Sequence, residues 1–336
     1  MIADNEVRSK VSPFSMRQNE IKVFDGKDGY VSMNQIMAKI NSGVINDIHF
    51  TIIELINEFD FLTSRQLFQL LQIRGIEIKD QNAVNRKLDQ LMKNKIITRY
   101  YFKNESGMSD YRVYCLEKMG KYILTSREIP STWQPSDVAK PIEIIKKKLS
   151  INQLLIAYMT KVKAFKTYKN KPELSAKIIG KKFKAGLRIT VEFEGKNIDF
   201  IYESIRREAN WHKKLEERLV YYRDFYNNFT SGDSEFAVRP QLVLLCEDSK
   251  HMAETFKEIV MNKLEIPNIP APIAEEKPKL EIPSKPAPAT VPAEENKALP
   301  QAPAPVAKEN KLPETGSQGS EWLIATGLMA ALTAYG

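Results

Sequence analysis

The chain of 336 residues has little cysteine and histidine, and this scarcity excludes several classes of protein. Its two cysteines, Cys115 and Cys246, are too few for a disulfide scaffold or a four-thiolate zinc site. The three histidines, His49, His212 and His251, lie far apart in the sequence and lack the spacing typical of metal ligands. We therefore expect no metal site and no cofactor.

The C-terminal part lacks aromatic residues and is rich in proline. No aromatic residue occurs between Phe256 and Trp322, and 12 of the 18 prolines follow Glu265. Such a segment cannot bury enough apolar surface to offset the entropy that it would lose on ordering. We predict a disordered, Pro-rich spacer over residues 265–311, with a preference for extended polyproline II.

Acidic residues are in deficit over the rest of the chain. The whole chain has a formal charge of +8, whereas residues 265–336, with six Lys and nine Glu, carry −3. Residues 1–264 therefore carry +11. An excess of this sign favours a polyanionic partner, without identifying it.

The first 20 residues, MIADNEVRSKVSPFSMRQNE, lack the apolar stretch of a secretory signal peptide. On this ground we expect the body of the protein in the cytoplasm. Over residues 1–44 we predict an N-terminal extension with a small hairpin, formed by Ile21–Phe24 and Gly29–Met33, followed by a short helix to Lys39.

Three helices are predicted after this extension. Apolar residues between Ile48 and Phe59 recur on one helical face. Thr63 opens a capping box for a second helix, which Gly75 ends, and Asp80 can cap a third helix that reaches Asn94.

Alternating residues then predict a hairpin with strands at residues 96–103 and 111–116, joined by the turn-forming NESGMSD. Three helices followed by a hairpin is the order of a winged helix. We therefore predict a winged-helix domain over residues 45–128.

The remaining pattern predicts an α+β fold with a second, small α/β sheet domain. Residues 129–169 form a connecting segment with a long helix, Ile142–Phe165. Residues 170–264 form the second domain. Its expected elements are a hairpin (187–193 and 197–202), a helix (206–229), a central strand (Gln241–Cys246) and a closing helix (251–264).

Candidate contacts to duplex DNA lie on the outward face of the third helix and on the hairpin. They are Gln81, Asn82, Asn85, Arg86 and Lys93 on the helix, and Arg99, Lys103 and Arg112 on the hairpin. Asn and Gln can pair with adenine in the major groove, Arg with guanine, and basic side chains with phosphates. The alternative is a solvated helix face on a winged helix that binds a protein.

Five segments resemble the replication-relaxation family: TSRQLFQLLQIRG, NAVNRKLDQLMKNKIITRYYF, YRVYCLEKMGKYIL, KKKLSINQLLIAYMTKV and IDFIYESIRREANWHKKLEERLVYYRDFY. Members of this family occur on plasmids and conjugative elements, mostly of Gram-positive bacteria. The resemblance implies a winged helix joined to a domain similar to the PD-(D/E)xK nucleases. It also implies duplex DNA and other plasmid replication or transfer proteins as partners, and it is compatible with a homodimer.

The residues that nuclease chemistry requires are incomplete. This chemistry needs a metal held by an Asp and by an Asp or Glu, with a Lys two residues later that positions the attacking water. Asp199 and Glu203 lack that Lys, and Glu194-Gly195-Lys196 falls in a predicted turn. We therefore expect a degenerate scaffold without catalysis. The alternative is a metal-dependent nuclease with a remodelled site of Glu192, Asp199 and Glu203.

The last residues, 312–336, resemble an LPxTG cell-wall sorting signal. Leu312-Pro313-Glu314-Thr315-Gly316 precedes an apolar segment, WLIATGLMAALTAYG. The resemblance implies that sortase would cut between Thr315 and Gly316. The apolar segment is shorter than the roughly 20 residues that span a bilayer, and no Lys or Arg follows it.

The two ends thus favour different compartments. Three explanations fit this conflict. The gene is a natural fusion whose tail enters the membrane from the cytoplasm, or its start is misassigned and hides a signal peptide, or the tail is a relic of recombination. We expect a cytoplasmic body, membrane-associated through its C-terminus, that binds duplex DNA. The alternative is a cell-wall-anchored surface protein of a conjugative element, with sortase and the membrane as partners.

Overall fold

The computed structural model describes residues 11–109, 111–231 and 235–261, and the side chains up to residue 259. This part is a mixed α+β structure with several sheets, which confirms the predicted fold class at that level. The predicted spacer and the Leu312–Gly316 motif lie outside the described residues.

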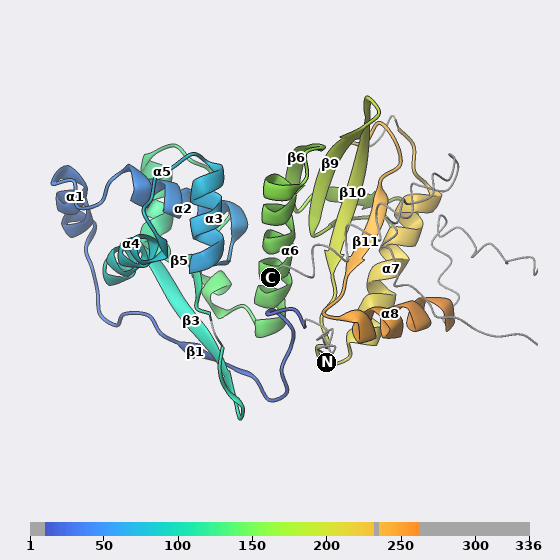
Figure 1. Ribbon diagram of the computed structural model, residues 1–336, viewed down its shortest axis with the longest axis horizontal. Helices are drawn as coiled ribbons and strands as arrows, with labels where there is room; N and C mark the ends of the chain where they lie inside the picture. Colours follow the sequence, from blue (N-terminus) through green and yellow to red (C-terminus); the bar gives the residue numbers. More distant parts are fainter. Residues whose placement is uncertain (1–10, 110, 232–234, 262–336) are drawn as a thin grey trace, which may run out of the picture. The chain divides into compact units, whose positions relative to one another are not determined.

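The N-terminal elements are mostly helical and include one antiparallel sheet, whose strands β1 and β3 extend away from the helices (Figure 1). The helices are α1 (Met33–Asn41), α2 (Asp47–Phe59), α3 (Ser64–Ile73), α4 (Gln81–Lys93) and α5 (Lys118–Ser126). The strands are β1 (Ile21–Phe24), β2 (Leu62–Thr63), β3 (Ile97–Asn104), β4 (Gly107–Met108) and β5 (Val113–Leu116). They form one sheet in the order β1-β3-β5-β2, with β4 paired to β3.

Local capping fixes where α3 and α4 begin. The Thr63 hydroxyl accepts a hydrogen bond from the Gln66 amide, and the Gln66 side-chain oxygen accepts one from the Thr63 amide. The Asp80 carboxylate accepts a hydrogen bond from the Ala83 backbone at 2.7 Å. These bonds satisfy amide groups that the first turn of a helix leaves without partners. Both predicted helix starts are therefore confirmed.

The predicted N-terminal hairpin is wrong. Strand β1 pairs antiparallel with β3, with Ile21 opposite Lys103 and Phe24 opposite Tyr100, and the segment after Gly29 leads into α1 without forming a strand. Alternation predicts a strand but does not specify its partner. The pairing of β1 with β3 is stabilised by an aromatic contact as well as by backbone hydrogen bonds, because the ring of Phe24 packs edge-on against that of Tyr100.

A long helix, α6 (Ile142–Lys161), follows the short 3₁₀ helix η1 (Pro135–Ala139). Helix α6 contacts α3 of the N-terminal elements and β10 of the second sheet. Its Ile145 and Leu149 are fully buried in a cluster that includes Phe14 and Phe102. The helix ends before the predicted Phe165, because Phe165 opens a strand instead.

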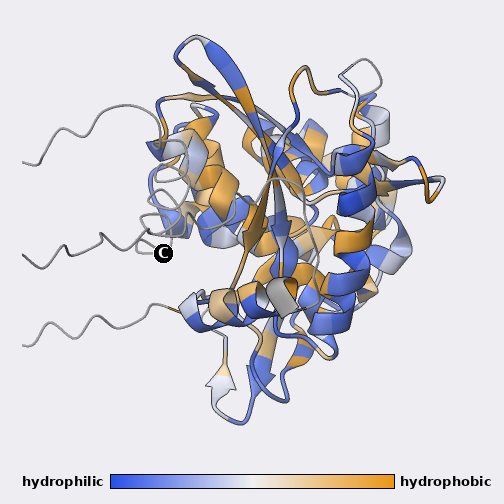
Figure 2. Ribbon diagram, turned by 90° about the vertical axis from the view of Figure 1, so that its right-hand side faces the viewer, coloured by the Kyte–Doolittle hydropathy of each residue, from blue (hydrophilic) through white to orange (hydrophobic). Residues whose placement is uncertain are grey.

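The second half contains a four-stranded sheet, a two-stranded sheet and two helices. The large sheet has the order β11-β10-β9-β6, with β6 (Phe165–Asn170), β9 (Leu187–Phe193), β10 (Lys196–Ser204) and β11 (Gln241–Leu245). The small sheet pairs β7 (Glu173–Ala176) with β8 (Lys181–Lys184), and the helices are α7 (Trp211–Asn227) and α8 (Ser249–Met261). In Figure 2 the apolar residues gather where helices face strands.

Two expectations for this half need correction. Strand β11 pairs parallel with β10 alone among the described strands, so it is an edge strand and not a central one. Helix α7 begins at Trp211 and not at Arg206. Asn210 has a left-handed conformation (φ 57°), and the buried Arg206 guanidinium donates to the carbonyls of Ile205 and Leu245.

A tight turn at Asp60 lies where the N-terminal elements meet α6. Asp60 has φ 63° and ψ −56°, and the Phe61 amide donates to the Phe59 carbonyl at 2.7 Å, which is the geometry of a γ-turn. This conformation costs about 1–3 kcal/mol in a residue with a side chain. Asn152 offsets the cost, because its amide donates to the carbonyls of both Phe59 and Phe61.

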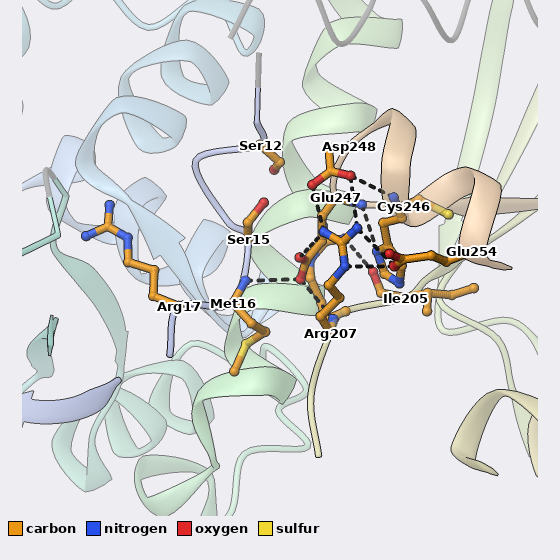
Figure 3. A network of polar contacts seen from close by, with 12 residues as sticks. Ser12, Ser15, Met16, Arg17, Ile205, Arg207, Cys246, Glu247, Asp248 and Glu254 are labelled. Carbon is orange, nitrogen blue, oxygen red and sulfur yellow. Dashed lines mark hydrogen bonds and ion pairs between the residues drawn. The ribbon is translucent and has the colours of Figure 1, made fainter. Parts of the chain in front are cut away.

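The segment before β1 is bound to the second half through Glu247, which follows β11 (Figure 3). The Glu247 carbonyl accepts a hydrogen bond from Ser12, and its carboxylate accepts one from the Met16 amide at 3.0 Å. The same carboxylate oxygen accepts a bond from the Arg207 amide at 3.0 Å. Glu247 is buried, so these bonds are shielded from water and tie the N-terminal segment to the end of β11.

Next to this network, the fully buried His251 gives the fold a dependence on pH. Its Nδ1 accepts a hydrogen bond from the Glu247 amide. Burial, together with the charges of Arg207 and Arg206, lowers the pKa of His251 to about 4, although Asp248 and Glu254 act in the opposite direction.

We predict that the free energy of unfolding decreases as the pH falls from 6.5 to about 4. In this window the unfolded chain binds a proton at the histidine and the folded chain does not. In the variant His251→Gln, the decrease in the free energy of unfolding between these pH values should be smaller by on the order of 1–3 kcal/mol. Urea unfolding at several pH values measures this decrease. His212→Gln, at the half-exposed histidine of α7, is the control and should keep the wild-type slope.

Candidate nucleic-acid interface

Helix α4 buries one face and exposes the other. Val84, Leu88 and Leu91 are fully buried, whereas Asn82, Arg86 and Lys93 are exposed. Among the described residues, no hydrogen bond or ion pair engages these three exposed side chains. We call Asn82, Arg86 and Lys93 the α4 face. It offers an amide and two cations to a partner in solution, and the half-exposed Asp89, which is paired with Arg99, lies between Arg86 and Lys93 on the same side of the helix.

Two further candidates on α4 are partly engaged within the protein. The half-buried Gln81 donates to the Ser64 carbonyl at 3.0 Å and to the Asn85 side-chain oxygen at 3.4 Å. The first of these bonds brings the first turns of α3 and α4 together. Gln81 and Asn85 therefore position the start of α4, and contact with a partner would have to compete with these bonds.

The three basic candidates after α4 differ in their surroundings. Lys103 is exposed on β3. Arg99, whose side chain is 18% exposed, forms ion pairs with Asp25 at 3.0 Å and with Asp89 at 3.1 Å. Arg112, 54% exposed, forms an ion pair with Asp25 at 2.8 Å. The structure thus brings Arg99 and Arg112 together around one carboxylate.

The Asp25 carboxylate is the feature of this region that the sequence analysis did not predict. Asp25 follows β1, and its position depends on the pairing of β1 with β3. Because the prediction paired Ile21–Phe24 with Gly29–Met33, it left Asp25 away from the arginines. The alternating residues of β3 also predict a strand, and this strand was a second possible partner for β1. That alternation was the available signal for the observed pairing.

His49 supports α4 from beneath. The ring is fully buried, and its Nε2 contacts the Gln90 side-chain oxygen at 2.7 Å. Its Nδ1 contacts both the Asn46 amide at 3.1 Å and the Asn46 side-chain oxygen at 2.9 Å, and in the tautomer whose Nδ1 accepts from the amide, Nε2 donates to Gln90. Burial lowers the pKa of His49, which keeps the ring neutral and this bond in place at neutral pH.

Another exposed cation lies near α4. Arg65, in the first turn of α3, is exposed, and no hydrogen bond or ion pair holds it within the described ranges. The bond between Gln81 and Ser64 places the first turns of the two helices side by side. Arg65 was missed because the candidates were taken only from the third helix and the hairpin. The capping box at Thr63 places Arg65 in the first turn of a helix, and this was the available signal.

The carboxylates considered for nuclease chemistry have partners on the second sheet. Asp199 forms a two-bond ion pair with Arg188, with both distances at 2.9 Å. Glu203 accepts bonds from Arg218 at 3.0 Å and from the buried Tyr222 hydroxyl at 2.6 Å. Burial raises the pKa of Tyr222, which keeps its hydroxyl proton available for this bond.

Glu192, the third carboxylate of the alternative metal site, forms an ion pair with Lys166. Among the described residues, no group of three or more His, Cys, Asp or Glu side chains could hold a metal ion. The three carboxylates of the alternative are thus not brought together. Within the same residues, no helix is both long enough and apolar enough to cross a bilayer.

Two family models match the chain, and no solved structure matches it significantly. The LPXTG cell wall anchor motif matches residues 304–336, which lie outside the described structure. The replication-relaxation family matches residues 53–172, which contain α3, α4, the strands β2 to β5 and α6. The chain is thus similar to the replication-relaxation family over its N-terminal elements and to cell-wall anchors at its C-terminus.

Proposed function

We propose that the protein is a DNA-binding accessory protein of plasmid replication or conjugative transfer. In this proposal a winged helix within residues 45–128 binds duplex DNA, with α4 in the major groove. The family match over residues 53–172 supports the role in replication or transfer. The formal charge of +11 over residues 1–264 supports a nucleic acid as the partner.

The observation that carries the proposal is the α4 face. A helix that buries its apolar side and leaves an amide and cations without internal partners is suited to a groove that offers donors, acceptors and phosphates. Arg86 and Asn82 are suited to base edges, and Lys93 and Lys103 to phosphates. Arg65 adds a cation beside the first turn of α4.

We further propose that the second sheet acts without catalysis, as a scaffold. Asp199 and Glu203 are neutralised by Arg188 and Arg218, so a metal ion would have to displace both arginines. A carboxylate in a short ion pair also has less negative charge available to a cation. These contacts favour a structural role over metal binding.

The first prediction from this proposal concerns affinity. The full-length protein should bind a labelled duplex at low salt, with an affinity that falls steeply as salt is added. The double variant Asn82→Ala with Arg86→Ala, both on the α4 face, should weaken binding about 5- to 100-fold, the range expected for the loss of one good base contact. Mobility shift and fluorescence anisotropy measure both effects.

The matched control is Lys213→Ala, which removes one positive charge from an exposed position on α7. It should change the affinity less than twofold at about 0.1 M salt, where exposed charges beyond about 10 Å are screened. Absence of binding at low salt, both by the wild type and by a variant that lacks the Asp25 carboxylate, would refute the proposal. Equal losses in the double variant and in Lys213→Ala would show that total charge, and not the α4 face, determines binding.

A second prediction concerns catalysis. Supercoiled plasmid DNA incubated with the protein and Mg²⁺ or Mn²⁺ should remain uncut, as judged on an agarose gel. Nicking that Asp199→Ala and Glu203→Ala both abolish would instead establish a nuclease with a remodelled site. Lys196→Ala serves as the control, because Lys196 opens β10 beyond the Glu194–Gly195 turn.

The second candidate function is a cell-wall-anchored surface protein of a conjugative element. The observation that favours it is the anchor match over residues 304–336, which contains Leu312-Pro313-Glu314-Thr315-Gly316. In this alternative, sortase would join Thr315 to the wall and the +11 body would lie outside the membrane.

Cell fractionation separates the two functions. For the DNA-binding function we expect the protein in the cytoplasmic or membrane fraction, unchanged by Thr315→Ala. Accumulation in the wall fraction, lost on Thr315→Ala but kept in Ser317→Ala just beyond the motif, would establish the anchored protein. Detection uses an antibody against the body, because the tail would be processed.

A further inference from the structure

The Asp25 carboxylate occupies the point where two arginines of the candidate interface converge. Its Oδ2 lies 3.0 Å from Arg99 Nε and 2.8 Å from Arg112 Nε. Arg99 comes from β3 and Arg112 from the residue before β5. Two guanidinium groups aimed at one oxygen form an arrangement that also binds phosphate oxygens.

The backbone fixes this carboxylate in place. The Asp25 amide donates to the Arg99 carbonyl at 2.9 Å, and Arg99 Nε also donates to the Asp25 carbonyl at 3.0 Å. At the next residue, Gly26, a Cβ atom would lie 2.4 Å from the Phe24 ring and 2.8 Å from the Thr98 hydroxyl. A side chain at this position would force the Phe24 ring or Thr98 to move, so the glycine lets the chain pass close to β3 beside Asp25.

The charge on the site is suited to exchange. A carboxylate and a phosphodiester each carry one negative charge, so either can form ion pairs with the same two guanidinium groups. Arg112 is 54% exposed and therefore accessible from solvent. Arg99 keeps a second ion pair, to Asp89 at 3.1 Å, so it stays anchored to α4 when Asp25 leaves.

We propose that Arg99 and Arg112 form a binding site for one backbone phosphate of duplex DNA, and that the Asp25 carboxylate occupies this site until the DNA displaces it. This proposal rests on the proposed DNA-binding function. It adds that the Asp25 carboxylate competes with a DNA phosphate for the two arginines. The N-terminal extension then limits the affinity of the interface, because each binding event must break two ion pairs of Asp25.

The test compares Asp25→Asn with Asp28→Asn in the full-length protein. Asp28 lies in the same N-terminal extension, is exposed, and has no hydrogen bond or ion pair among the described residues. Both variants remove one negative charge, but only Asp25→Asn frees the arginines. The probe is a labelled duplex, titrated at several salt concentrations, with fluorescence anisotropy as the readout.

We expect Asp25→Asn to bind about five- to tenfold more tightly than the wild type at 0.1 M salt, and Asp28→Asn to bind less than twofold more tightly. The slope of log K against log salt should steepen by about one to two in Asp25→Asn, as expected for one or two additional cation–phosphate contacts. Adding Arg112→Gln to Asp25→Asn should abolish the gain. A thermal melt of each variant shows that the fold is kept.

The outcomes separate the two proposals. If the wild type binds and the two Asn variants bind equally well, Asp25 does not compete with DNA, and the DNA-binding function stands. The same holds if the gain in affinity of Asp25→Asn survives the addition of Arg112→Gln. Binding by Asp25→Asn alone supports the competitor and shows that the wild-type interface is blocked. Absence of binding by the wild type and by Asp25→Asn overturns both proposals. If Asp25→Asn binds DNA more weakly than the wild type and its thermal melt is unchanged, Asp25 contributes to DNA binding. This outcome refutes the proposal that Asp25 competes with DNA.

Discussion

The described part of the molecule depends on polar side chains that α6 carries into the interior. Lys146 is 1% exposed, and its ammonium donates to the Ser15 carbonyl and to Glu20, which binds the N-terminal segment to the helix. Asn152 satisfies the carbonyls on both sides of the Asp60 turn. An unpaired buried amide or ammonium costs several kcal/mol, so the observed position of α6, which satisfies both groups, is favoured over positions that leave either unpaired.

This constraint extends to the surface around α4. The N-terminal segment leaves the Glu247 network, passes Lys146 and continues into β1, which pairs with β3. At the end of β1, Asp25 contacts the two arginines, and Arg99 contacts Asp89 of α4. A series of hydrogen bonds and ion pairs therefore runs from the end of β11 to Asp89 on the exposed side of α4. The position of α4 depends on contacts at both ends of this series.

The sequence predicted the elements that depend on local contacts and missed those that depend on distant ones. The starts of α3 and α4 could be predicted because Thr63 and Asp80 bond to amides three residues away. The partner of β1 could not, because it lies far along the chain. Strand β6 was missed because its residues, FKTYKN, show the polar pattern of an edge strand. The α4 face was predicted from amphipathicity, whereas the engagement of Gln81 and Arg99 depends on tertiary contacts that composition does not show.

The passage of the N-terminal segment along both halves has a consequence for the modularity of the protein. Residues 45–128 contain α4 and both arginines, but the carboxylate that contacts those arginines belongs to the preceding extension. A gene rearrangement that transplanted the helical unit without its leading segment would transfer the cations and leave their counter-charge behind. The descendants of such an exchange would inherit a more cationic surface. The extension and the helical unit are therefore best regarded as one unit of inheritance.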